Sequence, residues 1–224
     1  KNIVDKILSP LGLRVDESFP MVDARLKDGT RINVIISPVS VNPMVVTIRK
    51  FRQNILGVDD LIRLGMLNQD TAQFLRSQVE KKANIMISGG TSTGKTTLLN
   101  ILSNFISAQE RIVTIEDTLE LKLNLPHVIR LESKPANLEA KGAVTIRQLV
   151  KNSLRMRPDR IIVGEIRGPE AIDVLQAMNT GHNGSLSTLH ANSCPDMLSR
   201  LETLLLVNNF NLTDASVKRI IASA

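Results

Sequence analysis

The stretch Ile85–Thr97, IMISGGTSTGKTT, decides the fold class of this 224-residue chain. Glycines in such a segment let backbone N–H groups curl around phosphates, and the start of the following helix adds partial positive charge. A short apolar strand at 85–88 leads in and a helix at 96–106 leads out. This context favours a phosphate-binding loop over a turn that fits the pattern by chance. The pattern G-x-x-x-x-G-K-[ST] and the residue after it comprise Gly89, Gly90, Thr91, Ser92, Thr93, Gly94, Lys95, Thr96 and Thr97.

The loop pattern assigns a task to two of its residues. Lys95 is expected to reach the β- and γ-phosphates of a nucleotide, and the Thr96 hydroxyl to bind Mg²⁺. A phosphate loop specifies nucleotide binding and not hydrolysis. Any catalytic carboxylates must therefore come from other segments.

The chain around the loop alternates between strands and helices. Such alternation predicts an α/β domain with a mostly parallel sheet. Upstream, we expect a short helix near 61–65 and a helix from an N-cap at Asn68 to residue 82. The predicted strands are 85–88, 111–115, 128–131, 161–164 and 186–189, and the predicted later helices are 96–106, 144–156 and 169–181.

The first fifty residues read differently. Strands at 22–26 and 31–36 flank Asp28-Gly29, a hairpin-turn signal, and a third β-rich run covers 44–49. This region shows no helical periodicity, so it predicts part of a small antiparallel-sheet domain. We place the domains at 1–53 and 54–224 and expect the C-terminal end to be truncated.

Composition limits the choice of partners. The chain has 28 Lys and Arg against 22 Asp and Glu, a net charge of +6, which favours anionic partners. It has no Trp, no Tyr and five Phe, so stacking platforms for single-stranded nucleic acid are scarce. No apolar run approaches the roughly 20 residues that a transmembrane helix needs. The single cysteine excludes an internal disulfide.

Two carboxylates follow predicted strands and are candidates for catalysis. Glu165 ends the apolar run Ile161–Gly164, where it could hold Mg²⁺ or polarise an attacking water; the alternative is a surface glutamate at a strand end. Glu116 ends another strand and could orient water or metal. For this second segment, the alternative is a helix N-cap at Asp117.

Four segments together resemble the secretion-superfamily ATPases, the hexameric motors of type II and type IV secretion and type IV pili. They resemble the Walker A, Asp box, Walker B and His box of that family. Segments 126–142 and 141–165, with RINVIISPVS and TIRKF upstream, most resemble the CpaF/TadA tight-adherence branch. The four segments are GGTSTGKTT (89–97), TIEDTLEL (114–121), RMRPDRIIVGEIRG (155–168) and MNTGHNGSLSTLHANS (178–193).

The resemblance implies a RecA-like ATPase domain and roles for further residues. Glu165 would be the Walker B glutamate and Glu116 the Asp-box carboxylate, each acting on water or Mg²⁺. His190 would sense the γ-phosphate, where a hydrogen-bonded core histidine is the alternative. The resemblance also implies nucleotide contacts by His182 of the His box and by Arg49 and Lys50 near the domain junction. It implies that Arg25 and Arg31 present charge to phosphates, including those of a neighbouring subunit. For these two arginines, the alternative is that they are solvated residues of the hairpin.

The sequence thus predicts an ATP-hydrolysing motor subunit for pilus assembly or protein secretion. We expect a homo-hexamer in the cytoplasm, associated with inner-membrane platform proteins and without direct nucleic-acid contact. One rival is a RecA-like nucleic-acid motor, which the charge of +6 and the phosphate loop support. The other is a non-catalytic, nucleotide-gated assembly subunit.

Overall fold

The computed structural model describes residues 2–26, 28–50, 57–135, 141–208 and 211–224. The chain divides into two compact units, Lys1–Ile55 and Leu56–Ala224, and each is described by itself. The boundary predicted between residues 53 and 54 lies outside the described residues and stays a prediction.

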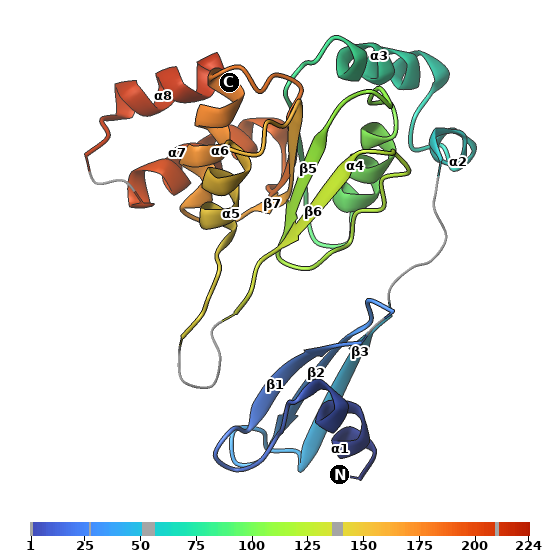
Figure 1. The fold of residues 1–224 in the computed structure, drawn as a ribbon, viewed down its shortest axis with the longest axis vertical. Coiled ribbons are helices and arrows are strands. Elements are labelled where there is room, and N and C mark those ends of the chain that lie inside the picture. The colour runs from blue at the N-terminus through green and yellow to red at the C-terminus, as the bar shows by residue number, and fades with distance from the viewer. Residues whose placement is uncertain (1, 27, 51–56, 136–140, 209–210) are drawn as a thin grey trace. The chain divides into compact units, whose positions relative to one another are not determined.

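The small unit is a three-stranded antiparallel sheet with the order β1-β2-β3 (Figure 1). The predicted hairpin between β1 and β2 is confirmed. The Thr30 N–H donates to Asp28 Oδ1 over 2.9 Å, and Gly29 has a left-handed φ of 87°. The elements are α1 (Asn2–Leu8), the 3-10 helix η1 (Ser9–Leu11), β1 (Met21–Arg25), β2 (Arg31–Ile36) and β3 (Met44–Arg49).

The expectation that the first fifty residues lack a helix was wrong, because α1 covers one face of this sheet. Val4 and Leu8, one helical turn apart, are buried with Ala24, Ile32 and Val34 in one cluster. A seven-residue helix spans barely two turns. Its periodicity is therefore too short to be recognised, and packing on the sheet stabilises it instead.

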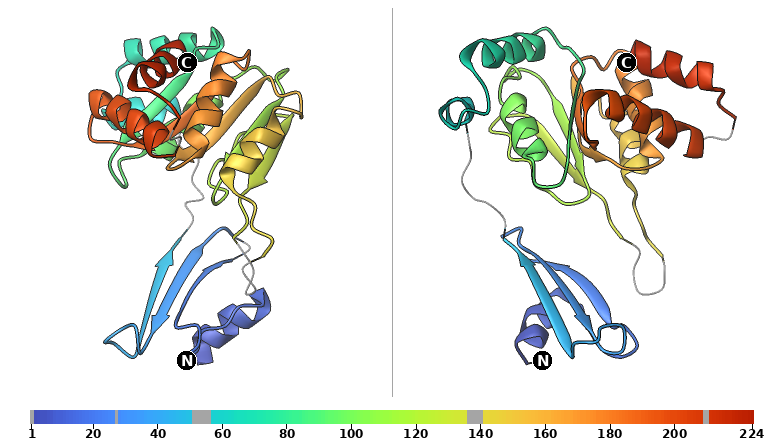
Figure 2. Two further views of the ribbon diagram at one scale, coloured as in Figure 1. Left: turned by 90° about the vertical axis from the view of Figure 1, so that its left-hand side faces the viewer. Right: turned by 180° about the vertical axis from the view of Figure 1, so that it is seen from behind.

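The large unit contains a five-stranded parallel sheet with the order β4-β8-β7-β5-β6. Helices lie on both of its faces (Figure 2). This confirms the predicted α/β fold. The elements are α2 (Val58–Arg63), α3 (Gln69–Glu80), β4 (Ile85–Gly89), α4 (Lys95–Ser103), β5 (Ile112–Glu116), β6 (Val128–Glu132), α5 (Ile146–Ser153), β7 (Arg160–Ile166), α6 (Glu170–Asn179), β8 (Leu186–His190), α7 (Cys194–Asn208) and α8 (Asp214–Ser223).

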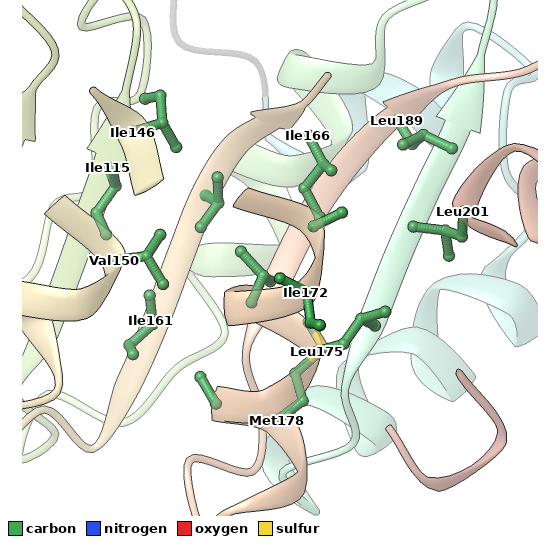
Figure 3. Packing of buried hydrophobic residues seen from close by; sticks show 14 of the residues in the cluster. Ile115, Ile146, Val150, Ile161, Ile166, Ile172, Leu175, Met178, Leu189 and Leu201 are labelled. Carbon is green, nitrogen blue, oxygen red and sulfur yellow. The ribbon is translucent and has the colours of Figure 1, made fainter. Parts of the chain in front are cut away.

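Alternation along the strands builds a buried core on each face of the sheet. Ile115 and Ile161 belong to the core beside α5–α8 (Figure 3). Ile112, on the opposite face of β5, packs with Leu99 of α4. Successive side chains of a strand point to opposite faces, so Glu116 lies on the α4 face, the face of the phosphate loop.

The amino end of this sheet contains a buried ion pair. Arg160, whose side chain is 1% exposed, donates from Nε and Nη2 to the two carboxylate oxygens of Glu110 over 2.8 and 2.9 Å. Its Nη1 donates to the carbonyl of Val79 over 2.8 Å. A Cβ on Gly184 would lie 2.6 Å from that Nη1. The glycine therefore makes room for the guanidinium.

Among the residues that the structure describes, no helix combines the length and the apolar character needed to span a bilayer.

Candidate functional site

The phosphate loop curls tightly in front of the first turn of α4. A Cβ on Gly89 would lie 2.5 Å from Thr93 Oγ1, so a larger residue there would displace the Thr93 side chain. Ser92 and Gly94 adopt left-handed φ values of 61° and 93°, and the Thr93 hydroxyl donates to the Gly90 carbonyl over 2.9 Å. The loop predicted from the sequence is present, between the strand and the helix that the pattern requires.

Lys95 lies inside this loop. Its side chain is 9% exposed, and Nζ donates to the Gly90 carbonyl over 2.7 Å. Burial lowers the pKa of Lys95, and the nearby Glu165 carboxylate acts in the opposite direction. Thr96, which follows Lys95 in α4, is half-buried.

Glu165 lies in a β-bulge of β7. Between Val163 and Ile166, one more residue is present on β7 than on the facing part of β8. The Thr188 hydroxyl of β8 donates to the Gly164 carbonyl over 2.7 Å, which satisfies a backbone group that the bulge displaces from the ladder. Bulges re-aim side chains next to active sites. This bulge changes the direction of the Glu165 side chain at the carboxyl end of β7, where its carboxylate lies next to His190.

His190 joins the phosphate loop to Glu165. It ends β8 and pairs in register with Gly89, the first residue of the loop. Its Nε2 lies 3.0 Å from Glu165 Oε1, with the His190 side chain 34% exposed. Partial exposure and a carboxylate neighbour support the site role over a core histidine.

Glu116 is buried on the α4 face and is 3% exposed. Its Oε2 accepts the backbone N–H groups of Glu120 and Leu121 over 2.7 and 2.9 Å, whereas its buried Oε1 has no hydrogen-bond partner among the residues that the structure describes. Burial raises the pKa of Glu116. A Cβ on Gly164 would lie 3.1 Å from Glu116 Cγ, so that glycine makes room for the carboxylate. Asp117 is exposed and caps no helix in the described chain.

Two charged residues that sequence reasoning missed lie at this edge. Arg167 donates to Glu165 Oε2, and that hydrogen bond raises the pKa of Arg167. Its Nη1 lies 3.8 Å from Asp117 Oδ2, and the Glu170 carboxylate holds its backbone by accepting the N–H over 2.7 Å. The carboxylate of Glu120 is close enough to add to the raised pKa values of Glu116 and Arg167. The available signal was an arginine two positions after a strand-end glutamate.

The structure does not place His182 at the phosphate loop. His182 precedes β8, whereas His190 ends that strand, so the two histidines lie towards opposite ends of a parallel sheet. Its carbonyl accepts from the Ser185 hydroxyl over 2.8 Å. Nucleotide contact by His182 stays a prediction.

The basic residues predicted upstream belong to the small unit, Lys1–Ile55. Arg25 pairs in register with Arg31 across β1 and β2, and Arg31 pairs with Arg49 across β2 and β3. The three arginines therefore form one row across the sheet, on one face, and Lys50 follows directly. Their contact with nucleotide stays a prediction.

Comparison of the sequence with known proteins gives consistent matches. The family model described as "Type II/IV secretion system protein" matches residues 2–224. An uncharacterized protein of Methanocaldococcus jannaschii is 49% identical over 83% of this chain and 26% of its own length. The type IV secretion system protein PtlH of Bordetella pertussis is 36% identical over 86% of this chain and 63% of its own. The chain thus spans between a quarter and two thirds of these curated relatives.

Solved structures share the fold. The VirB11 ATPase of the Brucella suis type IV secretion system, in complex with sulphate, is 29% identical with a TM-score of 0.62, covering 94% of this chain and 68% of that one. The pilus retraction motor PilT with bound ADP is 22% identical with a TM-score of 0.66, covering 95% of this chain and 60% of that one. The PilT likeness carries the fold alone.

Proposed function

Because the chain belongs to the type II/IV secretion system protein family, whose model matches residues 2–224, we propose that it binds and hydrolyses ATP as a secretion or pilus motor subunit. One observation carries the hydrolytic part: His190, in register with the first loop residue Gly89, has its Nε2 3.0 Å from Oε1 of the bulge carboxylate Glu165. A loop built only to bind nucleotide needs no carboxylate at that place. The VirB11 relative was solved with sulphate, an anion with the tetrahedral shape of a phosphate.

The reaction is attack of water on the γ-phosphate. Lys95 neutralises charge on the β- and γ-phosphates, and the loop N–H groups hold them in position. Glu165 or Glu116 orients the water, and His190 contacts the γ-phosphate side while its Nε2 stays near Glu165. Catalysis is then mostly positioning and charge neutralisation, as is usual for phosphoryl transfer.

The residues at this edge fit Mg²⁺. The Thr96 hydroxyl and the carboxylates of Glu116 and Glu165 are hard oxygen ligands, the type that Mg²⁺ prefers. In the described part of the chain, the buried Oε1 of Glu116 has no hydrogen-bond partner, as expected of an atom that serves a ligand or its water. When bound, the ion would neutralise charge on the phosphate oxygens.

The assembly that we propose is a hexameric ring in the cytoplasm, attached to inner-membrane platform proteins. The row of Arg25, Arg31 and Arg49 places three guanidinium groups on one face of the small sheet. Such a row suits phosphates of a neighbouring subunit's nucleotide, since arginines supplied in trans are a known source of transition-state charge. The tight-adherence pilus branch is the family branch that we propose, on the resemblance of segments 126–142 and 141–165.

A turnover assay with Glu165→Gln tests this proposal. The amide keeps the size of the side chain and removes its charge, so ATP should still bind while turnover falls roughly 10²-fold or more. Wild-type activity should also rise with protein concentration as rings form. If the wild type binds ATP without turnover at any concentration, the chain is a nucleotide-gated subunit and the hydrolytic proposal fails.

A further inference from the structure

Apolar side chains are exposed in the connection between α2 and α3, and one of them, Met66, lies beside the phosphate loop. Leu64 and Met66 are 61% and 57% exposed. The Met66 methyl carbon lies 3.9 Å from the position that a Cβ would take on Gly94, the residue that caps α4. A flexible thioether therefore lies directly against the loop, one residue before Lys95.

The backbone at Met66 is held by a complete helix-ending motif. Its N–H donates to the Leu61 carbonyl over 2.9 Å, and the Gly65 N–H donates to the Ile62 carbonyl over 3.0 Å. Gly65 has a left-handed φ of 71°. In this motif the residue after the glycine often packs back on its own helix. More than half of Met66 is instead exposed, and its end reaches the loop.

A nucleotide presents two kinds of surface to this region. Its phosphates are anionic and are served by loop N–H groups and Lys95, whereas its base is a flat aromatic ring that gains from apolar contact. A methionine sulfur is polarizable and makes favourable contacts with aromatic rings. The chain has no Trp and no Tyr, so few aromatic side chains are available to contact a base. A methionine can supply such a contact instead.

We propose that Met66 contacts the base of the nucleotide bound at residues 89–97, so that the site prefers a nucleoside triphosphate to bare polyphosphate. This inference rests on the proposed function, because it needs ATP at the loop. Met66 is then a specificity residue that takes no part in hydrolysis.

Calorimetric titration with two probes tests the inference: a non-hydrolysable ATP analogue and inorganic tripolyphosphate, each with Mg²⁺. Met66→Ala should weaken the analogue about three- to tenfold, the range of a sulfur–aromatic contact, and leave tripolyphosphate affinity unchanged. Met66→Leu should weaken binding of the analogue less than Met66→Ala does. Phe74→Ala is the matched control, since Phe74 is 60% exposed on α3 and should change neither affinity.

Three outcomes overturn the inference. Equal losses for both probes would mean that Met66 only supports the loop, and unchanged affinity for the analogue would mean that it contacts no base. Neither result affects the proposed function. A wild type that binds neither probe would overturn the proposed function and this inference with it. Unfolding curves of each variant check that the exposed substitutions leave the fold intact.

Discussion

The two ends of the parallel sheet both contain buried charges, and they treat those charges in opposite ways. At the amino end, Arg160 has a bidentate carboxylate partner and backbone carbonyls for its third nitrogen. At the carboxyl end, Glu116 is also buried, but one of its carboxylate oxygens has no hydrogen-bond partner in the ranges that the structure describes. Breaking a satisfied buried pair costs free energy, and an unsatisfied buried group costs free energy until a ligand completes it. The buried charge of Arg160 is therefore matched within the fold, whereas that of Glu116 is left to be completed by the ligand that we propose.

Lys95→Ala should give the largest effect and should affect activity alone. Removing the charge that faces the β- and γ-phosphates is expected to lower turnover roughly 10³-fold or more. The melting temperature should change little, because the lysine's polar contact within the loop is a single bond to Gly90. Steady-state ATPase assays and thermal unfolding check this. A folded variant with wild-type ATP affinity and turnover would refute the assignment of the loop.

Arg160→Ala should show the reverse pattern, a large loss of stability. Removing one partner of a buried pair costs about 3–5 kcal/mol. We expect a loss towards the lower end of this range, because Lys82 Nζ, 3.1 Å from Glu110 Oε2, still compensates part of the Glu110 charge. Denaturant unfolding of the wild type and the variant measures this. The double variant Arg160→Met with Glu110→Gln should recover part of the loss, since the buried Glu110 charge is then removed as well and the partner that Lys82 loses matters less at a side chain that is 45% exposed.

The same ion pair predicts a pH dependence. Arg160 holds the pKa of Glu110 below its ordinary value. The pair therefore stabilises the fold above the ordinary carboxyl pKa, and this contribution is lost as the pH falls through the lowered value. In Arg160→Met with Glu110→Gln, stability should fall less on acidification.

Gly184→Ala also tests the amino end of the sheet, with a smaller expected loss of stability than Arg160→Ala. The residue has a left-handed φ of 83°, and a new Cβ would meet the Arg160 guanidinium and the Lys82 backbone, 3.1 Å away at Cα. We expect a loss of about 1–3 kcal/mol in the free energy of unfolding. Gly181→Ala is the control, because its φ of 99° brings the same strain with no atom within 4 Å of the Cβ. If the two variants lost the same free energy of unfolding, the loss would come from backbone strain alone, and a clash with Arg160 would be refuted.

Glu116→Gln should slightly stabilise the protein while it impairs catalysis. Burial raises the pKa of Glu116, so ionised Glu116 destabilises the fold above that raised pKa, and the penalty disappears below the ordinary value. The glutamine keeps an acceptor for the two backbone N–H groups. Its melting temperature should exceed that of the wild type by about 2–5 °C at pH 8 and converge with it towards about pH 4. A lower melting temperature at pH 8 would show that the charge is stabilising.

Much of the fold could be predicted from the sequence, because strand and helix patterns alternate clearly between residues 85 and 190. The phosphate loop and the candidate carboxylates at 116 and 165 could be proposed from the sequence because they adjoin such strands. Helix α1 was missed because seven residues give too little periodicity. The bulge that contains Glu165 was missed because it depends on pairing with β8, which local patterns do not reveal. Arg167 was overlooked because it ends no apolar run.

The bulge in β7 also bears on how the subunit can move. Val163 before it and Ile166 after it are fully buried in the same core, so Glu165 is anchored on both sides within three residues. Shifting the carboxylate along the strand would expose one anchor or the other, since a one-residue slip reverses every side chain. If this protein works as a motor, the glutamate is its fixed point. The displacement that does mechanical work must then come from segments outside β7.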